Sequence, residues 1–334
     1  MGIGKISVSK TSLGIHIGHD SGVSLVKDGV LVNSICQERL SRLKHDGFDL
    51  KFPKKALDYI LSTTNTQLDN IVYSVCTQHE YEEDYKKYLA YIDEIRETLN
   101  LTISIKNLIN HHTAHVISTY DFFGLKEEAV GLVVDMGGSI FYKNGVKNGV
   151  EAHTIFDINK TEVKTLYQYK TPNKTQYSLG AFYEKAGQKL ELGTFNTCSG
   201  KLMGLAGYGN EKTVQNSWPE PFINIPEDLN EEISFKFKTW DDFDFSNIKS
   251  YNDMADFSLK VQMEFENAIM FLVKKAKFLK NCDTLVLGGG CFLNSIVNQK
   301  IIDSKIFNNI YIIPATDDSG ISIGCAYYGY RELQ

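Results

Sequence analysis

The sequence predicts an α/β protein made of two lobes, because the same order of elements occurs twice along the chain. Each time, apolar strand-like runs broken by glycine-rich turns are followed by alternating helices and strands. The length of 334 residues also exceeds what one hydrophobic core usually holds, so two domains are expected.

The first group of elements begins with three strands between residues 12 and 37. Asp28-Gly29 separates two apolar runs there, which is a strong signal for a β-hairpin. Pro53 is expected to open a helix over KKALDYILSTT, and NIVYSVC (70–76) to form a short buried strand. The charged stretch from about 79 to 98 and a segment beginning near His111 are expected to be helices.

The second group starts with AVGLVVDMGG (129–138), a strand that ends in a glycine turn. SIFYKNG and EAHTIFDINK extend it as a meander, and a helix is expected at about 179–190. A long helix after residue 250 carries an apolar face made of Phe257, Val261, Phe265, Ala268 and Leu272. A strand at 284–290, a helix over CFLNSIVNQKII, a strand at 309–315 and a final helix from about Asp318 complete the pattern.

One segment, at about 210–250, fits neither group. It combines three prolines with many acidic residues, and we expect an insertion or surface lobe there rather than part of a core. The element order therefore predicts two ribonuclease H-like lobes around a nucleotide cleft, the actin/sugar-kinase/Hsp70 (ASKHA) architecture. The lobes are expected at 1–127 and 128–334, with the last helix packing back on the first lobe as an option.

Composition and charge exclude several classes of protein. The apolar content of 43% and charged content of 23% are ordinary for a globular protein, and a net charge of -6 argues against a nucleic-acid partner. No apolar run is long enough to cross a bilayer, and the first residues lack a signal-peptide core, so we expect a cytoplasmic protein. The six cysteines form no CxxC pair, so neither disulfides nor a thiolate zinc site are expected.

Three glycine-rich turns each follow a predicted strand: GHDSG (18–22), DMGGS (135–139) and GGG (288–290). Glycine lets backbone N–H groups approach a phosphate, and the third turn leads into a helix whose N-terminus favours an anion. A single such turn is most often only a tight turn, but the three together favour nucleotide binding. Neither GxxxxGK[ST] nor GxGxxG occurs, which argues against P-loop and Rossmann folds.

Three of the eight histidines lie in NHHTAH (110–115). On a helix, His111 and His115 are one turn apart on the same face, a spacing that suits two imidazoles on one metal ion. The alternative is a helix start with hydrogen-bonded histidines. Asp318 is the leading candidate for a third ligand, and its alternative role is a helix N-cap. This ligand set suits Fe(II), or else Zn(II) or Mn(II).

Two further histidines and two arginines are candidates for substrate chemistry. His19 lies inside the first glycine turn, and His45 follows Arg39 and Arg42 in ERLSRLKHD. A cluster of Arg, Lys and His after a strand suits an anionic substrate, although a solvated loop has the same composition.

The chain resembles the N-terminal domain of the nodulation-type and tobramycin-type O-carbamoyltransferases, which is related to the tRNA threonylcarbamoyl-transfer metalloprotein. The resemblance covers nearly the whole chain, and the combination of segments is far more specific than any one of them. The matching segments, in order, are GHDSGVSLVKDG, QERLSRLKHDGFDLKFP, NHHTAHVISTY, VVDMGG, YSLGAFYEKAG, SGKLMGLAGYG, LGGGCFLNSIVNQKI and IPATDDSGISIGCAYYG.

This resemblance implies roles for individual residues. It implies that His111, His115 and Asp318 bind a metal ion, with Fe(II) the expected metal. It also implies that ATP or carbamoyl adenylate, with or without Mg²⁺, occupies the cleft. The residues that it assigns to the nucleotide are Asp135, Gly137, Gly138, Lys201, Gly204, Gly288, Gly289, Gly290 and Asn294. His19 and His45 match the catalytic histidines near the acceptor hydroxyl.

The chain also departs from the family pattern. Met136 and Ser139 replace the usual glycine and acid of the second glycine turn, Gln37 stands where Glu is usual, and Gly207 replaces a common proline. Family members continue into a second domain that makes carbamoyl adenylate from ATP and carbamoyl phosphate. Because the matching segments reach the last residues of this chain, we expect a separate adenylate-forming protein as its partner. We expect a small-molecule acceptor of secondary metabolism and no membrane partner, and a homodimer is left open.

Together these assignments predict carbamoyl transfer from carbamoyl adenylate to a hydroxyl group. We assign the general base to His45, with His19 as its orienting partner or alternative base, and anion binding to Arg39 or Arg42. A metal ion beside the carbonyl and phosphate acts as a Lewis acid. One alternative is an ATP-dependent enzyme of the same fold that moves a different acyl group or drives a condensation. The other is a non-catalytic nucleotide-binding regulator or assembly subunit, which the changes in the second glycine turn motivate.

Overall fold

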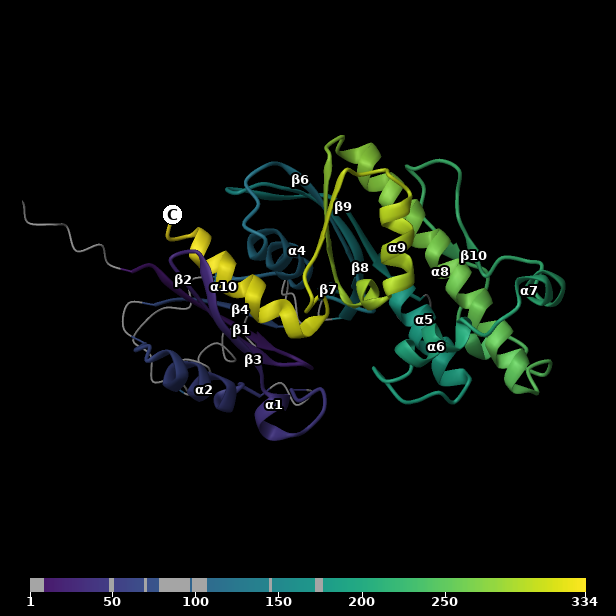
Figure 1. Cartoon of the computed structure of the whole chain (residues 1–334), viewed down its shortest axis with the longest axis horizontal. Helices are drawn as coiled ribbons and strands as arrows, with labels where there is room; N and C mark the ends of the chain where they lie inside the picture. Colours follow the sequence, from purple (N-terminus) through teal and green to yellow (C-terminus); the bar gives the residue numbers. More distant parts are fainter. Residues whose placement is uncertain are drawn as a thin grey trace, which may run out of the picture.

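The computed structural model describes residues 9–47, 51–68, 71–77, 97, 107–143, 146–171 and 177–334, which fold around two mixed β-sheets (Figure 1). The helix expected at 79–98 falls outside these residues except for Glu97. Within the described ranges, no helix combines the length and the apolar character that crossing a membrane requires.

The first sheet has the strand order β3-β2-β1-β4-β5. Its strands are β1 (Thr11–Ile17), β2 (Gly22–Lys27), β3 (Val30–Cys36), β4 (Val72–Thr77) and β5 (Asn107–Leu108). The first three strands form an antiparallel meander, whereas β4 runs parallel to β1. Asp28 and Gly29 have φ values of 51° and 83°, the left-handed values that a tight hairpin turn requires, so the predicted hairpin is confirmed.

The second sheet has the strand order β13-β12-β6-β8-β7, and β9 also pairs with β8. Its strands are β6 (Ala129–Val134), β7 (Ile140–Lys143), β8 (Val146–Ile158), β9 (Val163–Thr171), β12 (Thr284–Gly288) and β13 (Asn309–Ile312). The pairs β6–β12 and β12–β13 are parallel, and β7, β8 and β9 form antiparallel ladders. The sequence pattern did not indicate β9, because its alternation of exposed and buried residues is irregular.

Nine α-helices are described: α1 (Glu38–Ser41), α2 (Lys54–Thr64), α4 (His111–Phe122), α5 (Leu179–Lys189), α6 (Ser199–Ala206), α7 (Glu211–Ser217), α8 (Tyr251–Leu279), α9 (Ser295–Asp303) and α10 (Ile321–Arg331). The five apolar residues predicted to form one face of α8 are all buried in the core beside the second sheet. The helix expected over CFLNSIVNQKII differs from the prediction. Residues Gly290–Leu293 form a 3₁₀ turn (η2), and α9 begins only after the Asn294 side chain caps it.

Helices α4 and α10 lie side by side between the two sheets (Figure 1), where α4 packs on β6 and β12 and α10 packs on β1, β2 and β4. Two glycines permit this close packing. A Cβ on Gly14 would lie 2.0 Å from the carbonyl oxygen of Ser322, and a Cβ on Gly324 would lie 1.9 Å from that of Ala114. The close approach brings the start of α4 next to the turn that precedes α10.

The segment at 210–250 is not the surface lobe that its composition predicts. It contains little regular structure, namely α7, the two-residue strands β10 (Ile223–Asn224) and β11 (Ser234–Phe235), and the 3₁₀ turn η1 (Trp240–Asp242). However, Phe222, Ile223, Ile233 and Trp240 are buried in the same core as α8. The expectation that this segment lies outside the core was wrong. It was based on the prolines and acidic residues and did not take account of the aromatic side chains, which pack against one another in this core.

Candidate active site

The two histidines predicted as metal ligands lie on the first turns of α4. The helix begins where it does because the Asn110 side chain caps it, its Oδ1 accepting from the Thr113 N–H at 3.0 Å. His111 and His115 are fully buried, and their Nε2 atoms are 3.2 Å apart. His112 points elsewhere, toward Thr154, as expected from the helical spacing.

Two carboxylates complete this cluster. Asp318 belongs to the 3₁₀ turn η3 (Asp318–Gly320), which is capped by Asp317, so Asp318 does not serve as the N-cap. Asp135 follows β6 directly, and it was predicted to face phosphate groups. The four residues whose ligand atoms converge are His111, His115, Asp135 and Asp318. Every pair that includes a histidine nitrogen is separated by 3.2 to 3.5 Å.

The geometry and chemistry of the cluster fit a divalent metal ion. Ligand atoms about 2.1 Å from a tetrahedral ion lie about 3.4 Å from one another, close to the separations seen here. Burial disfavours the charged form of all four groups, but the attraction between the histidines and the aspartates outweighs the effect of burial. The pKa values of His111 and His115 are raised and those of Asp135 and Asp318 are lowered. Two buried carboxylates facing two imidazoles are a donor set that a cation can occupy by displacing protons.

Asp20 holds the two other predicted histidines next to this cluster. His45 Nδ1 lies 2.9 Å from Asp20 Oδ1, and His19 Nδ1 lies 3.0 Å from Asp20 Oδ2. His19 Nε2 in turn lies 3.1 Å from Asp318 Oδ2. Burial lowers the pKa of His19, but Asp318 and Asp20 outweigh it and raise that pKa to about 9. His45 Nε2 is buried and has no hydrogen-bond partner among the described residues.

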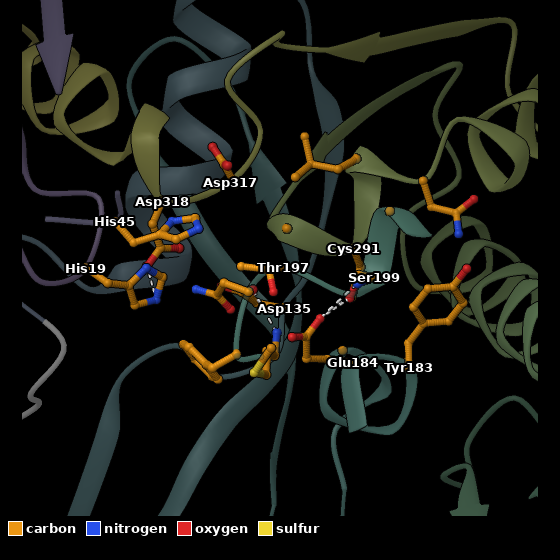
Figure 2. Close-up of a pocket in the computed structure, with 18 of the residues that line it drawn as sticks. His19, His45, Asp135, Tyr183, Glu184, Thr197, Ser199, Cys291, Asp317 and Asp318 are labelled. Atoms are coloured by element: carbon orange, nitrogen blue, oxygen red, sulfur yellow. Dashed lines mark hydrogen bonds and ion pairs between the residues drawn. The ribbon is translucent and has the colours of Figure 1, made fainter. Parts of the chain in front are cut away.

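One pocket of about 600 Å³ (Figure 2) is lined by His19, Asp20 and His45 and by Asp135 and Asp318 of the metal cluster. His111 and His115 are not among its lining residues. In Figure 2, His19, His45 and Asp318 lie on one side of the pocket, and Tyr183, Glu184 and Ser199 lie on the other. The predicted site residues that line it are His19, His45, Asp135, Gly137, Gly290, Asn294 and Asp318. A pocket of this size accommodates a nucleotide-sized ligand.

The structure does not bring the two predicted arginines to this pocket. Arg39 has a side chain that is 74% exposed and pairs with Glu38, and Arg42 is exposed at the left-handed end of α1. Lys44 is the cation of this segment that does line the pocket. Anion binding by Arg39 or Arg42 stays a prediction that this geometry does not favour.

The predicted nucleotide residues on α6 also lie outside the pocket lining. Lys201 is exposed, and its Nζ donates to the carbonyl oxygen of Leu192. Gly204 is exposed, and a Cβ there would meet nothing within 4 Å. Ser199, Gly200 and other residues of the same helix line the pocket instead.

Three of the predicted phosphate glycines serve close packing around the metal cluster. A Cβ on Gly138 would lie 2.7 Å from the His112 ring, and one on Gly288 would lie 3.1 Å from the backbone of His115. Gly289 has a φ of 98°, and a Cβ there would lie 2.3 Å from the carbonyl oxygen of Val134. Of the predicted glycines, Gly137 and Gly290 line the pocket.

Sequence reasoning missed the wall of the pocket opposite the histidines. Glu184 of α5 is 1% exposed, and its Oε2 accepts hydrogen bonds from the N–H and the hydroxyl of Ser199. Its Oε1 is buried without a partner among the described residues. Tyr183 and Phe265 supply apolar surface beside it. The segment YSLGAFYEKAG signalled this helix, but not which of its side chains face the pocket.

A comparison with protein families matches the family described as "Carbamoyltransferase N-terminus" over residues 11–104 and 75–327. The chain therefore belongs to this family.

Among curated proteins, the chain is similar to nodulation protein NolNO of Sinorhizobium fredii (strain NBRC 101917 / NGR234). The two are 23% identical over 364 residues, which cover 99% of this chain and 49% of that protein. It is also similar to the uncharacterized protein MJ1051 of Methanocaldococcus jannaschii, with 25% identity over 325 residues that cover 94% and 56%. The chain thus spans about half the length of these relatives.

Two solved structures share the fold. Full-length HypF in a phosphate- and nucleotide-bound form aligns with a TM-score of 0.60 at 13% identity, covering 97% of this chain and 56% of HypF. The activator of 2-hydroxyisocaproyl-CoA dehydratase from Clostridium difficile with bound ADPNP aligns with a TM-score of 0.52 at 12% identity, covering 96% and 95%. At these identities the likeness concerns the α/β fold with its mixed sheets.

Proposed function

We propose that this chain transfers a carbamoyl group from carbamoyl adenylate to a hydroxyl group of a small-molecule acceptor. The observation that carries the proposal is the lining of one pocket. It includes Asp135 and Asp318 of the four converging metal-ligand residues, an Asp-held histidine pair and a buried carboxylate with an unpaired oxygen. Membership of the carbamoyltransferase family supports the nature of the transferred group.

His111, His115, Asp135 and Asp318 would hold the metal ion, for which Fe(II) is expected and Zn(II) or Mn(II) are the alternatives. An ion bound there supplies Lewis-acid polarisation of carbonyl and phosphate oxygens.

His45 is the proposed general base. Because its Nδ1–H donates to Asp20, its buried Nε2 is left as an acceptor for the proton of the attacking hydroxyl. The acceptor oxygen bonds to the carbamoyl carbon, the bond from that carbon to the phosphate oxygen breaks, and AMP leaves. His19 has both ring nitrogens engaged by carboxylates, so it fits an orienting or charge-stabilising role better than that of an alternative base.

Glu184 is proposed to bind the ribose of the nucleotide. A carboxylate oxygen that is buried at a pocket wall without a donor favours a ligand with hydroxyl groups, and the vicinal hydroxyls of ribose meet this need. Tyr183 and Phe265 offer apolar surface for the base. The nucleotides in the two related structures are consistent with this assignment.

The finer fold class belongs to the same proposal. The strand order β3-β2-β1-β4-β5, with only β4 and β5 added in parallel, suits a ribonuclease H-like lobe. We therefore propose that the two sheets are the cores of two ASKHA lobes, with the pocket as the nucleotide cleft.

The direct test uses carbamoyl adenylate, a panel of hydroxyl compounds and mass spectrometry of the products. His45→Ala should lower the transfer rate by about 10²–10⁴-fold, the usual worth of a general base, without weakening AMP binding. Lys55→Ala, an exposed change on the neighbouring helix α2, should leave the rate unchanged. An unaltered rate in His45→Ala would remove the base assignment, and a wild-type protein that carbamoylates nothing in the panel and does not bind AMP would contradict the function.

A separate adenylate-forming protein is proposed as the source of the donor, following the resemblance of the sequence segments. The wild-type protein given only ATP, carbamoyl phosphate and an acceptor should release no AMP. AMP release under these conditions would show that this protein makes its own adenylate.

A further inference from the structure

A buried acid outside the pocket connects the second sheet to the start of α4. Glu151 of β8 is 0% exposed, and all its hydrogen-bond donors are neutral. Its Oε1 accepts from the Thr154 hydroxyl at 3.2 Å and from the side-chain amide of Gln168. Its Oε2 accepts from the Asn110 side-chain amide at 3.2 Å and from the Ser139 N–H at 3.3 Å. Burying a carboxyl group is costly unless its oxygens are hydrogen-bonded, and both oxygens of Glu151 are.

A β-bulge turns this acid toward α4. The pairing of β8 with β9 shifts register between Glu151 and His153. In a regular strand, Glu151 and Thr154 would point to opposite faces, since they are three residues apart. With the bulge they touch each other, while His153 joins a separate cluster with Glu232.

The contacts of Glu151 end on the cap of the metal-binding helix. The Asn110 amide that donates to Glu151 also donates to Ser139 Oγ at 3.1 Å, and the other end of the same side chain caps α4. The His111 N–H donates to the same Ser139 Oγ at 3.3 Å. Glu151 therefore fixes the orientation of the capping amide one residue before the first metal ligand.

A second path reaches the same turn through His112. The single proton of the Thr154 hydroxyl goes to Glu151, so Thr154 Oγ1 must accept from His112 Nδ1–H at 2.8 Å. This arrangement fixes the tautomer and the ring orientation of His112, which lies between the two metal ligands in the sequence.

We propose that Glu151 is a positioning residue that holds the first turn of α4 so that the Nε2 atoms of His111 and His115 meet the two carboxylates. The inference rests on the proposed metal site. Glu151 does not contact the ligand atoms, and it acts through Asn110, Ser139 and His112.

Three variants separate positioning from simple stability. Glu151→Ala removes the acceptor and leaves the Asn110 amide and the Ser139 N–H without it. Glu151→Gln keeps the shape and the acceptor for Asn110 and Ser139, because its oxygen can face them. Its NH₂ group then faces Gln168 and Thr154, so the acceptor for the Thr154 hydroxyl is lost. Ser139→Ala removes the hydroxyl shared by Asn110 and His111 at less risk to folding.

The experiment measures Zn(II) affinity by competition titration, together with hydrogen exchange at residues 111–118 of the metal-free protein. Glu151→Ala and Ser139→Ala should each bind Zn(II) about 10–100-fold more weakly, as is usual for residues that orient metal ligands, and exchange faster in α4. Glu151→Gln should change less than Glu151→Ala in both measurements, because it keeps the acceptor for Asn110 and Ser139. Ile155→Ala, a buried change on the same strand, is the control: it should lower the melting temperature without either effect.

The inference is overturned if the folded Glu151→Ala and Ser139→Ala proteins keep wild-type affinity, or if Ile155→Ala loses as much affinity as they do. Glu151→Gln behaving like Glu151→Ala would also contradict it, since the acceptor for Asn110 and Ser139 would then not hold the start of α4. If the wild-type protein binds no Zn(II), the proposed metal site fails instead, and hydrogen exchange in α4 alone decides whether Glu151 holds the helix start.

Discussion

Glu184 and Asp20 determine what the two ends of the pocket can bind. Asp20 is hydrogen-bonded to the Nδ1 atoms of His19 and His45, so the Nε2 atoms of both rings point away from Asp20. One carboxylate oxygen of Glu184 accepts hydrogen bonds from Ser199, and the other has no partner among the described residues. In the proposed function, the histidine end of the pocket accepts a proton and the Glu184 end binds hydroxyl groups.

Glu184→Gln should weaken AMP binding. The amide offers one carbonyl acceptor where the carboxylate offers two oxygens, so either Ser199 or the ribose loses a charge-assisted hydrogen bond worth about 1.5–3 kcal/mol. The expected increase in Kd, measured by calorimetry, is about 10–100-fold. Glu162→Gln, an exposed change, serves as the control. Equal AMP affinity in Glu184→Gln and wild type would remove Glu184 from the nucleotide site.

At the residue scale, the sequence predicted most of the metal cluster and little of the pocket wall. The helical spacing of His111 and His115 and the resemblance to a known family pointed to the ligands that the structure brings together. Asp135 was assigned to the nucleotide through the family resemblance, and nothing in the sequence pattern shows that its carboxylate turns to the histidines. Glu184 could not be predicted as a pocket residue, because its exposure depends on how α5 packs against α6 and α8.

The segment at 210–250 contributes more to the core than its prolines and acidic residues predict. Its Trp240 is fully buried, and its indole N–H donates to the carbonyl oxygen of Phe182 at 2.8 Å. Phe222 and Phe257 pack against the same ring. The segment therefore stabilises the core around α8.

Trp240→Ala should destabilise the protein by about 3–5 kcal/mol, the usual cost of emptying a large aromatic site. Chemical denaturation measures this loss, with Phe278→Ala as the control because Phe278 is 57% exposed. A loss below about 1 kcal/mol, similar to that of an exposed site, would contradict the burial of this segment.

Glu232 ties the same segment to the second sheet and makes its stability depend on pH. Burial favours the neutral acid, but the hydrogen bond and charge of His153, together with Tyr167 and Lys275, outweigh it and lower the pKa of Glu232. A lowered pKa stabilises the folded state above the ordinary value of 4.5, and this contribution is lost as the pH falls through the lower folded value.

The free energy of unfolding of the wild type should therefore decrease more steeply below pH 4.5 than that of Glu232→Gln, which lacks the titrating group. Denaturation curves measured over this acid range provide the comparison. Parallel pH profiles for the two proteins would show that Glu232 does not contribute.

The whole molecule brings together residues that lie far apart in the sequence. The site combines the first glycine turn, the start of α4, the end of β6 and the turn before α10, because α4 and α10 pack between the two sheets (Figure 1). The order of the longer helices and strands could be predicted from apolar periodicity, apart from β9. The short helices α1, α6 and α7 and the two-residue strands β5, β10 and β11 could not. The close approach of α4 and α10 could not, since it depends on contacts between distant glycines and backbone carbonyls.

Gly324→Ala tests this packing. Its Cβ would lie 1.9 Å from the carbonyl oxygen of Ala114, so α10 must move away from α4 and carry Asp318 away from the histidines. We expect a lower melting temperature together with weaker Zn(II) binding. Gly207→Ala is the matched control, because a Cβ there would come no closer than 3.4 Å to any neighbour. Unchanged stability and metal affinity in Gly324→Ala would contradict the observed packing.

Two imidazoles and two carboxylates are proposed to bind a divalent metal ion, and the two carboxylates also line the pocket. Metal analysis of the purified protein after exposure to Fe(II), Zn(II) or Mn(II) tests this proposal most directly, with His115→Ala as the comparison. We expect one tightly bound ion per chain in the wild type and none in the folded variant. A fully folded wild-type protein that retains none of the three metals would contradict the account.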